Sequence, residues 1–443
     1  MKLTFDNSII KCAKTVAFHP LTGLLPYEFS GNSREEYMAC RETAWLGGTL
    51  HIVRVYDVFG PDVVKFLNYT CVNRDFAKLP IGKSRHGITC NDKGQILANG
   101  LILRLAEDRF RTYSMAPALH YHMEKTDLDV QGEFVEDNEY FYQIDGPKSL
   151  EILEEACQCD LHDLKFAQNK KVMICGTEML IHRLGMSGAL GYEMHGEAKY
   201  ADIAFDRLKE VLDRFGGKLQ GFKNYCTLNH TPGGYPNHSI HFDLPYHYSW
   251  PDLSEFCARS WRKTKFLGSA ADDAQNYFVT PYDVGWESRV NFDHEFIGKE
   301  ALLELSKNPP RTTVTLEWNT EDVGDVFMSQ LRGLDVEPYD PIEFPTQQAE
   351  NVDGSTRMDY VLVDGKKVGL ATGKTISYYD RRMISLAYID KEYAVEGLDV
   401  VVLWGTPGHP QKEIRAKVAR FPYFNEPYRN ETFDVENIPH PQF

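Results

Sequence analysis

The chain has 443 residues, of which 42% are hydrophobic, 12% aromatic and 25% charged, as expected of an ordinary globular protein with two or three domains. Its net charge of -16 argues against nucleic acid and anionic membrane surfaces as partners, because both attract clusters of Lys and Arg. Nine cysteines without paired spacing indicate reduced thiols, and neither a secretory signal nor a membrane-spanning apolar run is visible, so we expect a cytoplasmic protein.

The first part of the chain is predicted to mix strands and helices. Apolar and polar residues alternate over 101–114 on both sides of 106–108, which predicts two strands joined by a short turn. A helix is expected to begin near Pro147, because proline favours the first turn of a helix. The segment 199–215 (KYADIAFDRLKEVLDRF) repeats apolar residues at helical spacing, and the following Gly216 is suited to end that helix.

Strands are predicted to dominate after about Arg311, in RTTVTLEW, DYVLVDGKKVGLA, MISLAYID and LDVVVLW, and Pro309-Pro310 marks a junction before this region. Within it, GLATGKT (369–375) has three residues between the first Gly and Gly-Lys-Thr, whereas a phosphate-binding loop needs four. We therefore expect a turn between two strands there. A nicotinamide-binding unit is not expected either, because no G-x-G-x-x-G motif follows an opening strand.

The segment 225–250 (YCTLNHTPGGYPNHSIHFDLPYHYSW) is rich in histidine and aromatic residues. His238 and His241 could lie near one another, but the tight spacing and the carboxylate or thiolate partners of a metal site are missing, so no metal is expected. We predict an ordered loop whose flat aromatic walls suit a planar ligand. A packed surface loop without a ligand is the alternative interpretation.

Four glycines interrupt the stretch GMSGALGYEMHG (185–196), which carries the carboxylate of Glu193. Glycine loses much backbone entropy on folding, so such a cluster indicates positive φ angles or a close approach of the chain to another group. A solvated strand position is the simplest alternative for Glu193. No nucleophile elbow or zinc-protease motif accompanies it, so the residues by themselves predict a binding site for a planar molecule and name no reaction.

Several motifs resemble, in the same chain order, the glycine-cleavage T-protein superfamily. RLGMSGALGYEMHG (183–196) is similar to its glycine-rich loop with a carboxylate, NDKGQILANGLIL (91–103) to one of its strands, and FDHEFIGKEAL (292–302) to one of its helices. Within the superfamily the chain most resembles the tetrahydrofolate-dependent aromatic O-demethylases of the vanillate and 3-O-methylgallate type. Further segments carry this likeness: NYFVTPYDVG (276–285), VTLEWN (314–319), RMISLAYID (382–390), VVLWG (401–405) and IRAKVA (414–419).

The resemblance implies an α+β fold of three domains around a central folate cavity. Two interleaved mixed α/β subdomains would occupy residues 1–305, and a C-terminal β-barrel residues 306–443. It also implies a methyltransferase that moves a methyl group from an aryl methyl ether to tetrahydrofolate, giving a phenol and 5-methyltetrahydrofolate, in the catabolism of aromatic compounds such as those derived from lignin. The expected partner is a methoxylated aromatic small molecule, and the oligomeric state is left open.

The resemblance also suggests which residues act. In the family a carboxylate at the position of Glu193 binds the aminopyrimidine edge of the pterin, a charge-assisted contact through two acceptor oxygens. Arg183, Tyr192 and Asn99 are the further cofactor-binding candidates. Tyr225 falls on a tyrosine of the demethylases, and a phenol with a pKa near 10 is a suitable acid for protonating a departing phenoxide. A tyrosine of the core is the alternative interpretation for Tyr225.

Two positions depart from the family pattern. T-proteins carry an acidic pair where this chain has Ala98-Asn99, which weighs against aminomethyl transfer because asparagine holds no negative charge beside a cationic amine. Met115 stands where the vanillate-type enzymes carry an arginine that binds the substrate carboxylate, so an uncharged methoxyarene is favoured. The substrate-binding candidates are Met115, His51, Tyr235 and Tyr248.

Two alternatives stay open. The first is another transfer reaction, either aminomethyl transfer or demethylation of a small amine or sulfonium compound. The second is a folate-binding scaffold without catalysis. Tyr225 and the aromatic segment favour an enzyme over a scaffold.

Overall fold

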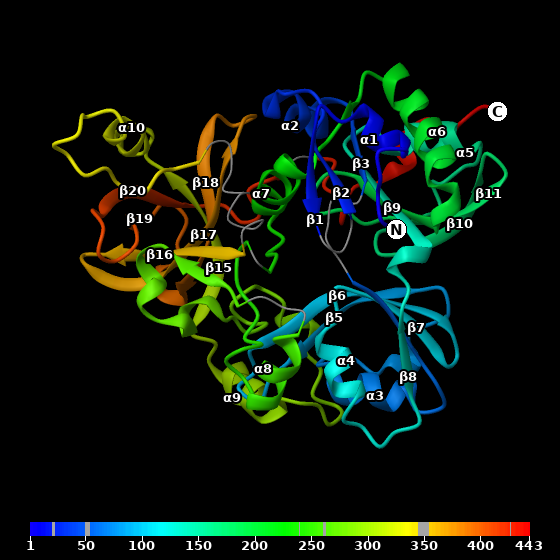
Figure 1. The fold of residues 1–443 in the computed structure, drawn as a ribbon, viewed down its shortest axis with the longest axis horizontal. Helices are drawn as coiled ribbons and strands as arrows, with labels where there is room; N and C mark the ends of the chain where they lie inside the picture. The colour runs from blue at the N-terminus through cyan, green and yellow to red at the C-terminus, as the bar shows by residue number, and fades with distance from the viewer. Residues whose placement is uncertain (20–22, 49–53, 239, 260–262, 344–353, 426) are drawn as a thin grey trace.

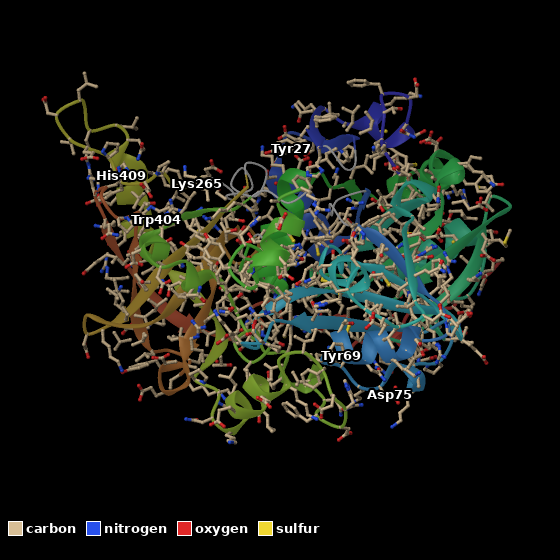
Figure 2. All side chains as sticks on the ribbon, turned by 60° about the horizontal axis from the view of Figure 1, so that its bottom comes forward. Tyr27, Tyr69, Asp75, Lys265, Trp404 and His409 are labelled. Carbon is tan, nitrogen blue, oxygen red and sulfur yellow. The ribbon has the colours of Figure 1, made fainter. Side chains whose placement is uncertain are left out.

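The computed structural model describes residues 1–443 except 20–22, 49–53, 239, 260–262, 344–353 and 426. Three β-structures surround a central helix, α7 (Phe222–Gly233), which packs against strands of the barrel and against β2 near the N-terminus (Figure 1). Figure 2 shows side chains filling these layers, with Trp404 and His409 at the barrel end and Tyr69 and Asp75 at the end of the five-stranded sheet. Among the described residues, no helix combines the length and the apolar character needed to cross a bilayer.

A six-stranded sheet, with the order β10-β11-β12-β9-β3-β13, forms the part of the molecule that holds both termini (Figure 1). Helices α5 (Ser149–Cys157) and α6 (Ala201–Arg214) pack on one of its faces and bury their apolar sides there. The strands are β10 (Asn169–Ile174), β11 (Thr177–His182), β12 (Gly191–Glu197), β9 (Glu139–Asp145), β3 (Trp45–Gly48) and β13 (Lys218–Leu219).

The second of the three β-structures is a five-stranded sheet with the order β5-β6-β7-β4-β8. Its core is shared with helices α3 (Val63–Thr70) and α4 (Ala118–Met123). The strands are β5 (Ser84–Cys90), β6 (Ile96–Ala106), β7 (Arg109–Tyr113), β4 (Val55–Phe59) and β8 (Gln131–Phe134).

Six strands of the C-terminal region close into a barrel, because β16 pairs with both β17 and β19 while β15 pairs with both β18 and β20. A short strand from the preceding region, β14 (Lys265–Leu267), adds to β16 in parallel. The barrel strands are β15 (Arg311–Trp318), β16 (Ser355–Val363), β17 (Lys366–Ser377), β18 (Arg382–Asp390), β19 (Asp399–Trp404) and β20 (Lys412–Ala419).

The remaining elements connect these three structures. The strands β1 (Thr15–His19) and β2 (Gly23–Glu28) form a separate hairpin near the N-terminus. The remaining helices are α1 (Ser8–Cys12), α2 (Ser33–Glu42), α8 (Pro251–Cys257), α9 (Lys299–Lys307) and α10 (Thr320–Ser329). Beyond β20 the chain leaves the barrel, and residues 427–443, here called the C-terminal tail, return to the six-stranded sheet beside the glycine-rich loop.

Most of the predicted elements are confirmed. The alternating segment forms the hairpin of β6 and β7, the helix near Pro147 is α5, and the segment 199–215 contains α6, which ends before Gly216 at a φ of 71°. Strands dominate after Arg311 as expected, and Pro309-Pro310 lies between α9 and β15. The division of the chain at residues 305 and 306 stays a prediction.

Two local predictions are wrong. Residues 369–375 form no turn between strands but lie inside β17, where the pairing with β18 shifts register between Thr372 and Thr375. The segment 225–250 is not a loop throughout, because its first nine residues belong to α7, with Pro232 inside the helix and Gly234 in the left-handed conformation after it. Tertiary packing explains the helix: the Thr231 hydroxyl donates a 2.7 Å hydrogen bond to the carbonyl oxygen of Gly373 on β17.

Candidate functional site

Strand β12 places Glu193 on the face of the six-stranded sheet that is turned away from α5 and α6. Its neighbours Tyr192 and Met194 belong to the hydrophobic core beneath those helices, and successive side chains of a strand point to opposite faces. Glu193 is nevertheless only 8% exposed. The carboxylate therefore sits in a buried polar layer and not, as the alternative interpretation had it, on a solvated strand.

A row of buried polar side chains runs across the sheet through Glu193. The residue opposite Glu193 on β9 is Gln143, and the residue opposite it on β11 is His182. The hydroxyl of Tyr225, which is buried on α7, donates a 2.7 Å hydrogen bond to Oε1 of Gln143. Tyr225 is thus hydrogen-bonded to Gln143, and Glu193 is paired with the same glutamine across β12 and β9.

The polar row continues from Gln143 into the glycine-rich loop. Nε2 of Gln143 donates hydrogen bonds of 3.1 and 3.2 Å to the two carboxylate oxygens of Asp145, and the Ser187 hydroxyl donates one of 2.6 Å to the same carboxylate. A Cβ atom on Gly185 would lie 2.9 Å from both of these oxygens, and one on Gly191 would come closer still. These two glycines are therefore needed for the close approach of the loop to Asp145.

Burial sets the protonation of the two acids. Loss of solvent around Asp145 raises the pKa of its carboxyl group to about 7, and the charge of Glu193 adds to the rise. Burial also raises the pKa of Glu193, which the nearby His195 partly opposes. Within the described part of the chain, no donor is hydrogen-bonded to the Glu193 carboxylate, so it is a buried acceptor that a ligand with N–H donors would satisfy.

Two histidines accompany Glu193. His182, His195 and Glu193 offer ligand atoms that all lie within 4.8 Å of one another. Both ring nitrogens of His182 are buried without a hydrogen-bond partner among the described residues, and burial lowers its pKa well below the usual value, which keeps the ring neutral. A neutral imidazole such as that of His182, beside a carboxylate, can hydrogen-bond a polar ligand or hold a divalent cation.

Five residues of this polar row were not predicted as site residues from the sequence: Gln143, Asp145, Ser187, His182 and His195. One signal was available, since His195 follows Glu193 by two positions and must share its face of the strand. The others lie on different strands or in the loop and become neighbours through pairing register. His241, which lies in the histidine-rich segment, is outside this row and uses both ring nitrogens in contacts with Thr231 and Asn237.

Two of the other three predicted cofactor residues have side chains that make contacts away from the Glu193 carboxylate, namely Arg183 and Tyr192. The Arg183 guanidinium donates hydrogen bonds to the carbonyl oxygens of Leu164, Asn430 and Phe433, and so fastens the loop to the C-terminal tail. The Tyr192 ring lies in the core on the opposite face of the sheet. Asn99 is on β6, with its amide nitrogen buried and without a partner among the described residues.

The predicted substrate residues separate into two groups. Met115 is fully buried, and Tyr248 packs at the edge of the same core around the five-stranded sheet. Tyr235 lies near the polar row instead: its hydroxyl donates to Glu431, and Asp145 is close enough to influence its pKa. His51 is outside the described residues.

Comparisons with known proteins agree with this architecture. A family model described as the GCVT N-terminal domain matches residues 13–230. A sesamin methylene transferase from Sinomonas sp. (strain No.22) is 44% identical over 431 residues, which cover 95% of this chain and 94% of the relative. A syringate O-demethylase from Sphingobium sp. (strain NBRC 103272 / SYK-6) is 31% identical over 431 residues, which cover 90% of each chain.

Among solved structures, the glycine cleavage system aminomethyltransferase T from Bartonella henselae superposes with a TM-score of 0.66 at 20% sequence identity, covering 93% of this chain and 95% of that one. This likeness confirms the predicted fold, including the mixed α/β sheets and the closed C-terminal barrel.

Proposed function

Because the chain belongs to the GCVT-domain family of glycine cleavage T-protein-type enzymes, we propose that it transfers a one-carbon unit from an aryl ether to tetrahydrofolate. In the form expected from the sequence, a methyl group leaves an aryl methyl ether, and the products are a phenol and 5-methyltetrahydrofolate. The observation that carries the proposal is the position of Gln143: it accepts a hydrogen bond from Tyr225, and it is paired with Glu193 across the strands. The proposed acid and the proposed pterin-binding carboxylate therefore lie in one buried layer.

The residues around Glu193 fit a folate. A pterin presents a paired N–H edge, and the Glu193 carboxylate is a buried acceptor with no donor among the described residues. The buried amide nitrogen of Asn99 is a second polar atom in need of a partner. We assign Glu193 and Asn99 direct contacts with the cofactor. Arg183 and Tyr192 would support the glycine-rich loop and β12 from the tail and from the core.

Tyr225 is the proposed general acid. Tetrahydrofolate supplies a nucleophilic nitrogen, N5, to which the one-carbon unit is transferred. The ether oxygen leaves as a phenol when Tyr225 gives it a proton, and the phenolic O–H matches the acidity of the phenol released. Gln143 would hold the hydroxyl in place: because its Nε2 donates to Asp145, its Oε1 must face Tyr225.

We assign the contacts with the substrate to aromatic and sulfur-containing side chains. Met115, His51, Tyr235 and Tyr248 remain the proposed contacts for a planar ring. A methionine at position 115 offers no charge to a carboxylate, which favours an uncharged aryl ether over a benzoate.

A second form of the reaction is favoured by the identity values. The relative named as a methylene transferase is 44% identical, whereas the relative named as an O-demethylase is 31% identical. In that form, a methylene bridge between two phenolic oxygens would pass to tetrahydrofolate, giving a catechol and a methylene-bearing folate. Methyl transfer breaks one C–O bond and needs one proton on the departing oxygen, whereas methylene transfer breaks two C–O bonds, forms two C–N bonds and moves two protons from the folate N–H groups to the catechol oxygens. Tyr225 would protonate the departing oxygen in the first form and one of the two departing oxygens in the second.

The test is turnover with defined substrates. The protein would be incubated with tetrahydrofolate and matched pairs of methoxyarenes and methylenedioxyarenes, each with and without a carboxylate, and folate products would be identified by mass spectrometry. We expect a methyl- or methylene-bearing folate together with a stoichiometric phenol or catechol. Folate binding without turnover of any aryl ether would support the scaffold alternative, and turnover of an amine or sulfonium donor alone would support the other.

A further inference from the structure

The C-terminal tail is bound to the six-stranded sheet near the glycine-rich loop. The main-chain N–H of Leu190 donates to the carbonyl oxygen of Tyr428, and the side chain of Asn430 donates to the carbonyl oxygen of Gly191 at 3.1 Å. The tail therefore supports the start of β12, the strand that carries Glu193. A separate cluster of titratable side chains holds the last residues of the tail, near Phe443.

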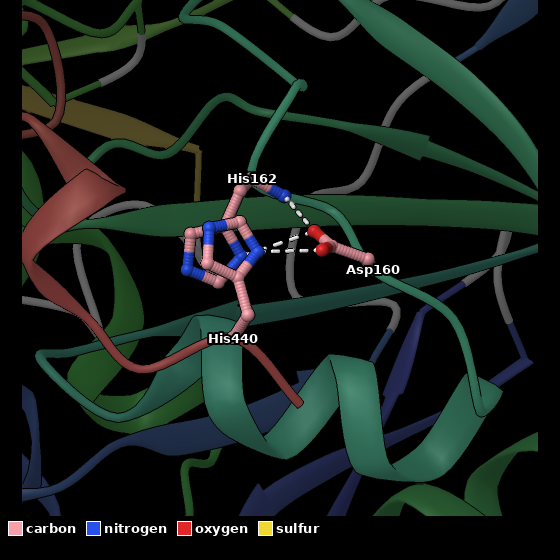
Figure 3. Close-up of side chains that lie close together, drawn as sticks. All are labelled: Asp160, His162 and His440. Carbon is pink, nitrogen blue, oxygen red and sulfur yellow. Dashed lines mark hydrogen bonds and ion pairs between the residues drawn. The ribbon is translucent and has the colours of Figure 1, made fainter. Parts of the chain in front are cut away.

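This cluster consists of two histidines and two carboxylates, here called the tail cluster: Glu154, Asp160, His162 and His440. Nδ1 of His162 lies 2.9 Å from Oε1 of Glu154 and 3.1 Å from Oδ1 of Asp160. Nδ1 of His440 lies 2.6 Å from Oδ2 of Asp160, and the two imidazole rings stack with centroids 3.9 Å apart (Figure 3). The ligand atoms of Asp160, His162 and His440 all lie within 4.8 Å of one another.

The tautomer of His162 is set by its surroundings. Nε2 lies 3.0 Å from the carbonyl oxygen of Ile438, a pure acceptor, so this nitrogen carries a hydrogen. In a neutral ring Nδ1 is then an unprotonated acceptor, although it faces oxygens of Glu154 and Asp160, which are acceptors too. Acceptors this close need a hydrogen or a metal ion between them: a second proton on the ring, a proton on the carboxyl group of Glu154, whose pKa is raised by burial, or a metal ion.

The groups around the tail cluster match those that orient metal ligands. Metal-binding histidines commonly donate the hydrogen of the other ring nitrogen to a carbonyl, as His162 does to Ile438. The main-chain N–H of Leu161 donates to Glu154 at 2.7 Å, and that of His162 donates to Asp160 at 2.9 Å. Donor atoms on one tetrahedral zinc ion, at about 2.0–2.1 Å each, are about 3.3 Å apart. The nitrogen–oxygen separations in the cluster are 2.6, 2.9 and 3.1 Å, so these atoms would have to move slightly apart to hold an ion.

We propose that the tail cluster binds a divalent transition-metal ion, zinc by its preference for imidazole and carboxylate ligands, and that the ion fastens the C-terminal tail to the sheet. Asp160 and His162 follow α5, whereas His440 comes from the tail, so the ion joins segments far apart in the sequence. Its role is structural. The proposal does not depend on the reaction proposed above.

Metal titration of the full-length protein tests the proposal. After chelation and desalting, binding of Zn²⁺ would be followed by calorimetry and that of Co²⁺ by its visible absorption, in wild type, His440→Ala and Asp160→Asn. We expect one ion per chain in wild type and an affinity lowered at least about 10–100-fold in both variants, the loss known for disturbed metal sites. The control is His409→Ala, which removes an exposed histidine 3.7 Å from Glu337 at the barrel end (Figure 2) and should bind normally.

A second readout follows the tail itself. Zinc should slow digestion of the C-terminus by carboxypeptidase in wild type and in His409→Ala, and it should have no such effect in His440→Ala. Two results would overturn the proposal. One is wild-type zinc binding only at millimolar concentration, which would leave His162 as a protonated ion pair with its carboxylates. The other is binding that persists in His440→Ala and is lost in His195→Ala, which would assign the ion to the buried histidines beside Glu193.

Discussion

Tyr225 donates a 2.7 Å hydrogen bond to Gln143, and both side chains are buried between α7 and the six-stranded sheet. Gln143 is also the residue paired with Glu193 across β9 and β12. One glutamine thus connects the tyrosine proposed as the acid with the carboxylate proposed to bind the pterin. Variants of the two side chains separate these roles.

Replacement of Tyr225 by phenylalanine keeps the ring and removes the proposed acid. We expect kcat to fall by about 10²–10⁴-fold, the usual loss for a general acid, with little change in the affinity for tetrahydrofolate. Steady-state kinetics and calorimetric titration provide the two values. Tyr423→Phe is a matched control, because it removes another hydrogen-bonded hydroxyl, donated to Glu317 in the barrel region. Full activity in Tyr225→Phe would refute the acid assignment.

Replacement of Glu193 tests pterin binding. We expect Glu193→Ala to leave the fold intact and to weaken tetrahydrofolate binding by about 2–3 kcal/mol, as for loss of one partner of a charge-assisted hydrogen bond. Calorimetry measures the change. Glu197→Ala, at the exposed end of the same strand, is the control and should bind as wild type does. Equal affinity in Glu193→Ala and wild type would remove Glu193 from the cofactor site.

Asp145 makes stability depend on pH. Its pKa is raised to about 7 in the folded protein, so the folded chain binds more protons than the unfolded chain between the two pKa values. This contribution is fully present below the ordinary carboxyl pKa and is lost as pH rises through about 7. The free energy of unfolding should fall over that range by at most about 1.4 kcal/mol per pH unit from this group.

Urea unfolding at a series of pH values measures the slope. Asp145→Asn should flatten it, because the amide does not titrate, whereas Asp399→Asn at an exposed ion pair should leave it unchanged. A slope that is identical in wild type and Asp145→Asn would mean that Asp145 stays ionised in the folded protein.

Replacement of Met115 tests whether this side chain contacts the substrate. Met115→Arg places a guanidinium in the core, so we expect a loss of stability of about 3–5 kcal/mol, the cost of an unpaired buried charge. If this position contacts the ring, a methoxybenzoate should partly restore the melting temperature and gain about 1–3 kcal/mol in kcat/KM relative to a neutral methoxyarene. Met115→Leu, which conserves volume, should change neither value. A melting temperature unaffected by methoxybenzoate would place Met115 away from the substrate.

Chelation separates the reaction from the tail cluster. No step assigned to Tyr225, Gln143 or Glu193 uses a metal, so the chelated enzyme should turn over at the rate of untreated enzyme when assayed well below its melting temperature. The initial rate before and after exhaustive chelation is the measurement. A loss of activity that one specific metal restores would contradict this prediction and would direct attention to His182 and His195 beside Glu193.

Local patterns in the sequence were sufficient for much of the architecture. The spacing of apolar residues predicted α6, the alternation before Ala106 predicted the β6–β7 hairpin, and strands followed Arg311 as expected. Such patterns are readable because each depends on the period of one element and on a face that must be buried. Motif resemblance extended this to the whole fold, which the structural comparison confirms.

The contacts of the site were decided by the tertiary structure. The sequence by itself singled out a glycine cluster around Glu193, but not that Gly185 and Gly191 make room for Asp145, or that Arg183 binds the C-terminal tail. Likewise, glycine and proline in the segment 225–250 favoured a loop, whereas packing against β17 makes its start helical. The physical reason is the same in each case: a side chain's partner across strands depends on pairing register and on chain return, and neither has a period along the sequence.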